Sequence, residues 1–388
     1  MGEKTAIKVL HLGDVFLDCP FSAMKAEESA VRRRETRETF ARAVKYAVDE
    51  EVDLVLLTGN LTDHHYATFE TMELLCRIFR AAPACRFLIA PGPHDPMTEN
   101  CLYRLAGLPA NVTVFDSARV SHVSFPDIGV NVFGWAFEGE AYPGSPLAID
   151  REEPETTGIT LEMGYAGVGE AAGNAPLSLN EIGDFGGDYL ALSGGRLFDG
   201  FHRVGTVTYA YSGALEHASY EEPGFGGGNL VTLTPVAGGG VHVEGARVNF
   251  GCRRYAMEEF DITGIESPNE VMNRITAVIK ERGYGRETAL RDLLTGRVPF
   301  GFAIPRTLTG ENFGLATFEL DDRTLPSFDD SRVARDMTGR GELCRTLIPA
   351  MRVGTDEEQH AAAYALKLGL GALDGRDVTK LWERILQK

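Results

Sequence analysis

Short apolar runs alternate with longer amphipathic segments near the start of the chain. Apolar runs at residues 7–13, 52–59 and 86–90 have the length of buried strands, and each ends in a polar or glycine-bearing turn. Between them, apolar residues recur at helical spacing in residues 32–50 and 69–81. This alternation of strands and helices predicts an α/β layered fold.

After residue 112 the pattern changes to short runs separated by glycine and proline, which is typical of a second, β-rich sheet. The predicted strands lie at residues 112–115, 120–125, 130–137, 158–163, 188–193, 206–212, 229–233 and 241–250. The segment 138–158 is too polar for a core and is interpreted as a surface excursion. Two glycine-rich pieces, 224–228 and 238–240, precede no helical pattern, so we interpret both as hairpin turns and not as phosphate-binding loops.

A boundary between two domains, 1–252 and 256–388, is predicted where the β-rich pattern ends. Beyond it, Ser267 is predicted to cap a helix that has Pro268 in its first position and ends at Gly283. Strands are predicted at residues 288–296 and 313–320. A closing helix is predicted after Asp377. Together they predict a smaller α/β domain.

Composition narrows the class of protein further. Hydrophobic residues make up 44% and charged residues 24% of the 388 positions, an ordinary balance for a globular protein. The sequence has no apolar run long enough for a membrane span and opens without the pattern of a secretory leader, so we expect a cytoplasmic protein without a membrane partner. The six cysteines form no C-x-x-C pair and are interpreted as reduced thiols.

The formal net charge of −18 repels a phosphate backbone at long range. Any contact with DNA therefore needs a local basic patch, such as Arg32 to Arg34 or the pair Arg253 and Arg254. The run from Arg32 to Arg34 opens a helical pattern, and its first interpretation is a solvated helix end.

Candidate chemistry lies in the turns that follow the predicted strands, because ligands bind at the carboxyl ends of strands in α/β sheets. The turns carry HLGDVF (11–16), GNLTD (59–63), GPHD (92–95) and, later, YLALSGGR (189–196). In this order they resemble the calcineurin-like metallophosphoesterases. Within that superfamily the sequence is most similar to the SbcD-type nuclease subunit of a DNA double-strand-break repair complex and its bacterial exonuclease relatives.

The resemblance implies a four-layer αββα sandwich, with two mixed β-sheets flanked by helices, followed by a C-terminal α/β cap domain. It also implies a hydrolase by descent, an SbcC-like ATPase partner, contact with DNA, and a homodimer. Family members hold two divalent metals through a D-x-H motif, a GD motif, a GNH motif, a lone His and a GHxH motif, and manganese or magnesium is the expected ion.

Of the ligands that the resemblance implies, Asp14 is intact and Asn60 takes the position of the bridging Asp. The other ligand positions are occupied by Phe16, Pro93, Met163, Gly195 and Leu197. Two dications about 4 Å apart repel by roughly 17 kcal/mol at an effective dielectric constant of about 20, and a neutral Asn60 cannot offset this repulsion. The predicted metal site of Asp14 and Asn60 is therefore weak or absent.

His94 and Asp95 match the family's transition-state His and its supporting carboxylate, and they are the candidate catalytic residues. His64 and His65 follow the second motif. Because adjacent side chains at a strand end point to opposite faces, at most one of these two would face the site, and a surface turn is the simpler interpretation.

The sequence is compatible with three functions. The first is a non-catalytic or weakly active homologue that serves as a scaffold for a partner ATPase or nucleic acid. The second is an active metal-dependent phosphodiesterase or nuclease with a rearranged or mononuclear site. Its candidate residues are Asp14, Asn60, Asp63, His64 and His94. The third is a regulatory module that binds a small anion in the old pocket.

Overall fold

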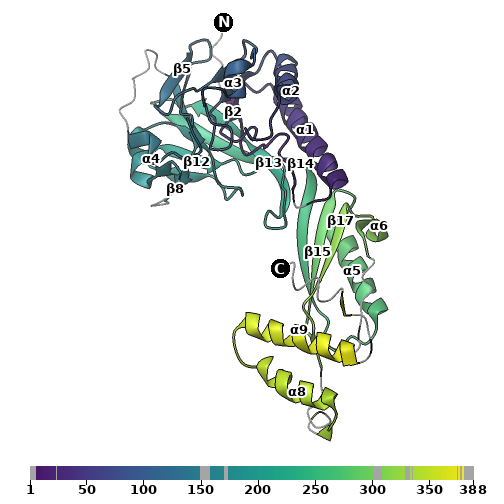
Figure 1. Ribbon diagram of the computed structural model, residues 1–388. Helices are drawn as coiled ribbons and strands as arrows, with labels where there is room; N and C mark the ends of the chain where they lie inside the picture. The colour runs from purple at the N-terminus through teal and green to yellow at the C-terminus, as the bar shows by residue number, and fades with distance from the viewer. Residues whose placement is uncertain are drawn as a thin grey trace. The chain divides into compact units, whose positions relative to one another are not determined.

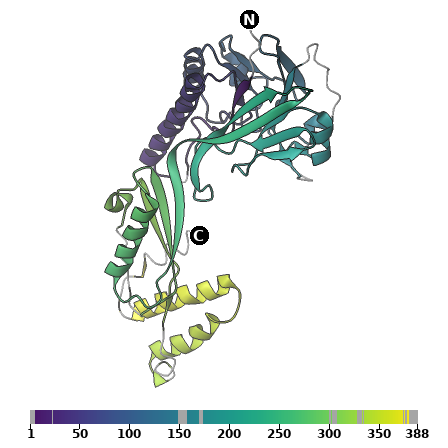
Figure 2. The same cartoon turned by 180° about the vertical axis from the view of Figure 1, so that it is seen from behind.

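A computed structural model gives the fold of the chain (Figures 1 and 2). It describes residues 6–22, 24–148, 158–169, 174–299, 308–327 and 335–373, together with residues 302, 333, 375, 378 and 379. The chain divides into two compact units, Met1–Tyr255 and Ala256–Lys388. Each unit contains its own cluster of buried apolar side chains.

The first sheet of the amino-terminal unit is built on the buried apolar runs near the start of the chain. In spatial order its strands are β14 (Val241–Asp261), β13 (Gly224–Pro235), β1 (Ile7–Leu12), β2 (Leu54–Leu57), β3 (Arg86–Ile89) and β4 (Val112–Val114). Strands β1 to β4 are parallel, whereas β13 is antiparallel to both β1 and β14. The sheet is therefore mixed.

Helices cover the outer face of this sheet. They are α1 (Ala26–Asp49), α2 (Phe69–Arg80) and the short α3 (Leu102–Leu105), and Figure 1 shows α1 and α2 side by side. Helix α1 buries Phe40, Ala43, Val44 and Ala47, which recur at the spacing of one helix face. Helix α2 begins at a capping box formed with Thr68.

The second sheet of this unit is mixed as well. In spatial order its strands are β11 (His202–Val204), β12 (Val207–Tyr211), β10 (Tyr189–Ser193), β7 (Ile159–Tyr165), β6 (Val130–Gly134) and β5 (Ser121–Phe125). The four central strands are parallel and the two edge strands antiparallel. Near α4 (Leu179–Phe185) lie the 3₁₀ turn η1 (Pro146–Ala148) and the two-residue strands β8 (Gly167–Val168) and β9 (Pro176–Leu177).

Two apolar clusters join these layers. One contains side chains from both sheets, for example Leu56 of β2 and Leu161 of β7, together with Phe79 of α2. The other lies on the far side of the second sheet and joins Trp135 and Leu190 to Phe185 of α4. The predicted sandwich of two mixed sheets flanked by helices is confirmed.

The carboxyl-terminal unit has a small sheet with the order β17 (Thr317–Asp322), β15 (Thr288–Thr295) and the end of β14. Helix α5 (Pro268–Arg282) packs its Val271, Ile275 and Ile279 into the cluster of this unit. As predicted, Ser267 caps α5, and Gly283 ends it in the left-handed conformation at φ 62°. The unit also contains β16 (Arg297–Val298), β18 (Leu325–Pro326), α6 (Gly310–Phe313), α8 (Gly339–Ala350) and α9 (Asp356–Leu373).

Two details of this unit differ from the sequence analysis. Helices α8 and α9 were not predicted; they share an apolar cluster that includes Ile348 and Leu366. The closing helix expected after Asp377 falls almost entirely outside the described residues. In the described part of the chain, no helix has the length and apolar character that crossing a membrane requires.

The glycine-rich segment 224–228 is a strand and not a hairpin turn, so that prediction was wrong. A Cβ atom on Gly227 would lie 2.1 Å from the Val248 carbonyl oxygen, and one on Gly226 would lie 2.4 Å from the Leu215 carbonyl oxygen. Glycine is needed here because neighbouring backbone passes very close. The second segment, Gly238 to Gly240, does form the turn between β13 and β14.

Candidate functional site

The turns after β1, β2 and β3 meet at one edge of the first sheet and bring Asp14, Asn60 and His94 together. The Asp14 N–H donates to the Gly59 carbonyl oxygen at 3.1 Å, and the Phe16 N–H donates to the Asn60 carbonyl oxygen at 2.9 Å. Parallel strands that end side by side thus place residues far apart in the sequence within hydrogen-bonding reach.

Three residues of these turns have left-handed backbone: Asp14 at φ 46°, Phe16 at φ 51° and Asn60 at φ 54°. This region is uncommon for residues other than glycine, most of all for a bulky aromatic residue, and such conformations cluster at functional sites. Gly13, just before them, has no room for a side chain, because a Cβ atom would lie 2.5 Å from Ser212 Oγ.

The side chain of Asn60 links its neighbours in two directions. Its Nδ2 donates to Asp14 Oδ1 at 2.7 Å, and its Oδ1 accepts from the His94 N–H at 3.0 Å. An amide offers both a donor and an acceptor in this position, whereas an ionised carboxylate offers acceptors alone. A carboxylate at residue 60 would lose the bond to Asp14 and place a second negative charge beside it.

Asp14 is 4% exposed and sits in this hydrogen-bonded pocket. Burial raises the pKa of its carboxyl to about 6. Hydrogen bonds from Asn60 and the Gly194 N–H, and the charge of Arg196, act in the opposite direction and lower this pKa. Arg196 is in turn paired with the buried Glu222. This arginine is the cation that the sequence analysis missed near Asp14.

Asp95 joins the turns after β2 and β3 to each other and to α3. Its Oδ1 accepts from the N–H groups of Gly92 and Asn60, and its Oδ2 accepts from the Leu61 N–H and the Tyr103 hydroxyl, at 2.7 to 3.0 Å. Burial raises the pKa of this carboxyl as well. Tyr103 was not found from the sequence, since its hydroxyl reaches Asp95 from α3.

His94 presents its ring toward solvent, with 51% of the side chain exposed. Its Nδ1 lies 3.4 Å from Asp63 Oδ2, and Phe16 meets the ring edge to face at 5.1 Å between ring centres. The carboxylate that faces His94 is therefore that of Asp63, whereas both oxygens of Asp95 are bound by the donors of the turns.

His64 and His65 lie in an exposed turn after β2, as the surface-turn interpretation expected, but the argument that their side chains point to opposite faces was wrong. Strand alternation does not apply in a turn, and the two rings stack on the same side with their centres 3.9 Å apart. Their ligand atoms and one oxygen of Asp63 all lie within 4.8 Å of one another.

Residues 7–154 match the family model described as calcineurin-like phosphoesterase. This match supports the calcineurin-like metallophosphoesterase superfamily for the part of the amino-terminal unit that it covers. A curated relative, the uncharacterized metallophosphoesterase YhaO of Bacillus subtilis, is 24% identical over 199 residues, which are 48% of this chain and 48% of that protein. The chain thus matches about half the length of this relative.

Two solved structures match part of the chain at low similarity. TT1561 of Thermus thermophilus is 14% identical with a TM-score of 0.37, covering 63% of this chain and 99% of that one. Vps29 of Chaetomium thermophilum is 15% identical with a TM-score of 0.24, covering 63% of this chain and 98% of that one.

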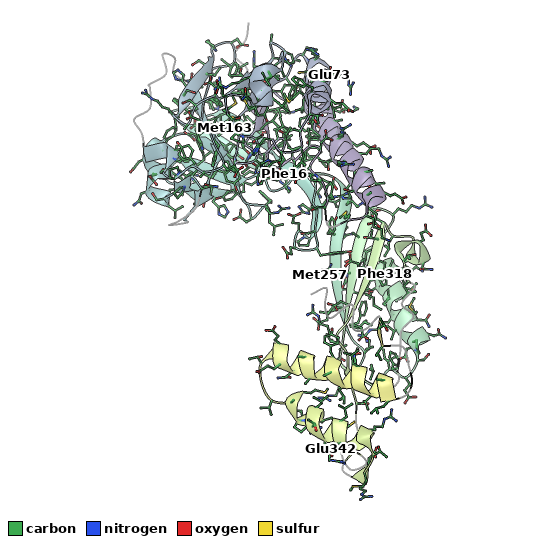
Figure 3. The ribbon with its side chains drawn as sticks, in the orientation of Figure 1. Phe16, Glu73, Met163, Met257, Phe318 and Glu342 are labelled. Atoms are coloured by element: carbon green, nitrogen blue, oxygen red, sulfur yellow. The ribbon has the colours of Figure 1, made fainter. Side chains whose placement is uncertain are left out.

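Metallophosphoesterases normally bind divalent metals, so we compared the donors around Asp14 with that requirement. Phe16 places an aromatic ring against His94, and Met163 is fully buried in the core among the strands (Figure 3). In the described part of the chain, the buried side-chain polar atoms of Asp14, Asn60 and Asp95 all have hydrogen-bond partners. They satisfy one another, and this donor set does not fit a dinuclear metal centre.

Two of the arginines suggested as a phosphate-binding patch, Arg32 and Arg253, are engaged within the unit, whereas Arg34 is exposed. Arg32 is fully buried, not a solvated helix end; it pairs with Glu216 at 3.2 Å and donates to the His217 carbonyl oxygen at 2.6 Å. Arg253 pairs with Glu35 at 3.0 Å. The positive charge of the run from Arg32 to Arg34 therefore does not show that these side chains are available to bind DNA.

Proposed function

We propose that the chain is a metallophosphoesterase homologue that has lost metal-dependent hydrolysis, or nearly so, and retains the domain as a scaffold for a protein partner. The observation that carries the proposal is the amide of Asn60, which bonds Asp14 on one side and the His94 N–H on the other. This amide sits where a bridging carboxylate would be required, and its hydrogen bonds stabilise the site without a cation.

The remaining chemistry at the site is limited. His94 is exposed and lies close to Asp63, so it could donate a proton to a leaving oxygen. A general acid alone contributes roughly 10²–10⁴ in rate, far below what phosphodiester hydrolysis needs. Among the described residues, nothing around Asp14 is arranged to activate water: Asp14 and Asp95 already accept hydrogen bonds from neighbouring groups.

A protein partner is favoured over nucleic acid. The chain has a formal net charge of −18, and both Arg32 and Arg253 are paired with carboxylates. An SbcC-like ATPase is the partner class that the sequence resemblance implies, and a homodimer is the assembly that it implies. Light scattering of the purified chain, alone and with such an ATPase, tests both.

The decisive experiment measures hydrolysis of bis(p-nitrophenyl) phosphate in excess manganese. We expect the wild-type rate to equal that of a His94→Ala variant. A variant with Phe16→His, Asn60→Asp and Pro93→Asn is assayed in parallel and tests whether three restored ligands recover any turnover. Gly195→His is left out because a Cβ atom there would lie 2.9 Å from the Tyr211 ring.

Turnover by the wild-type chain that requires metal and is abolished by Asp14→Ala would refute the proposal. Turnover that requires metal but survives Asp14→Ala would favour a rearranged, mononuclear phosphodiesterase instead.

A further inference from the structure

A second group of ligand-type side chains lies outside the Asp14 pocket, in the turn after β2. Asp63, His64 and His65 each offer one ligand atom, and all three atoms lie within 4.8 Å of one another. A shared zinc ion with bonds of about 2.0–2.1 Å brings its ligand atoms within about 4 Å, so only small side-chain rotations are needed.

The hydrogen bonds of this turn already orient the ligands. His64 Nδ1 lies 2.9 Å from the His94 carbonyl oxygen, and a carbonyl can only accept, so Nδ1 carries the proton. The lone pair of His64 is therefore on Nε2. A backbone carbonyl that binds the second ring nitrogen is the usual support of a metal-ligating histidine, because it fixes both the tautomer and the ring orientation.

Asp63 is fixed in the same way. Its Oδ1 accepts the His65 N–H at 2.9 Å, which closes the turn. The Asp63 side chain is only 9% exposed, whereas 32% of the His64 side chain and 61% of the His65 side chain are exposed. One held carboxylate and two accessible imidazoles make a preformed face that an ion can reach from solvent.

A fourth ligand comes from another part of the unit. Glu140 Oε1 lies 3.6 Å from His64 Nε2 and 3.5 Å from His65 Nε2. Both imidazoles thus face the same carboxylate oxygen. Two imidazoles and two carboxylates complete the four-coordinate set typical of zinc.

We propose that Asp63, His64, His65 and Glu140 bind one Zn²⁺ ion per chain. Imidazole ligands favour ions of the zinc class over magnesium, which prefers oxygen donors and water. The two carboxylates balance the charge of one dication. The ion joins the segment that follows β6 to the turn that follows β2, and its role is to stabilise this side of the domain.

The site adjoins the Asp14 site through His94 but shares no ligand with it, and the inference goes beyond the proposed loss of hydrolysis. The test uses the full-length chain freed of metal by a chelator and titrated with Zn²⁺ by calorimetry. We expect one tight site per chain. His64→Ala with His65→Ala should weaken Zn²⁺ binding at least about tenfold, and Glu140→Gln should weaken it by a smaller factor.

Two control variants separate this site from other sources of zinc binding. His242→Ala removes an exposed histidine of β14 and should leave the affinity unchanged. Asp14→Asn should also leave it unchanged, whatever the outcome of the hydrolysis experiment. Co²⁺ in place of Zn²⁺ should give the visible spectrum of a four-coordinate ion in the wild type and lose it in the double histidine variant.

Thermal unfolding gives an independent measurement. Zn²⁺ in excess should raise the midpoint of the wild type by about 2 °C or more and leave the double histidine variant unmoved. The proposal is overturned if the wild type binds no Zn²⁺, or if binding persists at full strength in the double histidine variant.

Discussion

Asn60 shows how one side chain can set the chemistry of a site. Asn60 lies in the turn at the end of β2 with left-handed backbone, and both polar atoms of its amide form hydrogen bonds within the site. Because a buried carboxylate such as Asp14 needs a donor or a cation, the amide supplies what a metal would otherwise supply.

Asn60→Asp should therefore destabilise the chain in the presence of a chelator. The variant loses the 2.7 Å hydrogen bond to Asp14 and sets two carboxylates against each other, so we expect a loss of about 2–4 kcal/mol at pH 8. Asn60→Ala removes the bond without adding charge and should cost about 1–2 kcal/mol at either pH. Urea unfolding at pH 5 and pH 8 makes the comparison, and equal losses for the two variants at pH 8 would contradict the like-charge argument.

At this scale the sequence predicted part of the site. Asp14, Asn60 and His94 could be placed together because each follows a buried strand. Arg196 and Tyr103 could not, since no spacing rule connects a loop arginine or a tyrosine of α3 to these turns. The stacked His64 and His65 were misjudged because a strand rule was applied to residues in a turn.

At the scale of single elements, strand β15 carries a polar residue where an apolar one is expected. Asp292 alternates with Leu290 and Leu294, which belong to the apolar cluster under α5. Neither oxygen of its carboxyl has a hydrogen-bond partner among the described residues. Burial, with a smaller effect from Glu258, raises the pKa of Asp292 to about 7.

This residue should make stability depend on pH. Between about pH 4 and pH 7 the unfolded chain releases the Asp292 proton while the folded chain keeps it, so the free energy of unfolding falls as pH rises through this window. Asp292→Asn does not titrate. Relative to the wild type, it should therefore gain about 1–3 kcal/mol between pH 4.5 and pH 8. Urea unfolding followed by circular dichroism measures the gain, and parallel pH profiles for the two proteins would contradict it.

A buried ion pair joins Arg32 of helix α1 to Glu216, which lies between β12 and β13 and also accepts backbone hydrogen bonds from β14. Glu216 accepts from Arg32, from the Thr39 hydroxyl and from the Cys252 N–H, and both charged side chains are 2% exposed. Glu216→Ala leaves a buried guanidinium and a backbone donor without this carboxylate. We expect a loss of about 3–5 kcal/mol by urea unfolding.

The control for this variant is Asp49→Ala in the same helix, which breaks the exposed pair with Lys45. It should change stability by no more than about 0.5 kcal/mol. Similar losses for Glu216→Ala and Asp49→Ala would show that burial does not decide the strength of these pairs.

For the whole molecule, the apolar and polar pattern was enough to predict the layered fold and the α5 helix with both its ends. It did not predict α8 and α9, whose apolar side chains share one cluster. It also mistook Gly224 to Gly228 for a turn, because the sequence does not show that other backbone passes within contact distance of these glycines.

Net charge also acts on the whole molecule, and it limits binding to DNA. With a charge of −18 and its candidate arginines paired, the chain should bind duplex DNA no more tightly than about 10⁻⁵ M at about 150 mM salt. Binding seen at lower salt should weaken steeply as salt is added. Fluorescence anisotropy with a labelled duplex measures both, and affinity that is unchanged by salt would show that phosphate contacts are not responsible.

The bond between Asn60 and Asp14 also bears on the evolutionary history of this chain. If the chain descends from a metal-binding ancestor, as proposed, a lineage could regain the ancestral ligands only through successive substitutions. A first reversion at residue 60 would create two adjacent carboxylates before the remaining ligands could hold a cation between them. An intermediate with Asp at residue 60 and no bound cation would be less stable than the present sequence, so selection for folding alone would oppose this reversion.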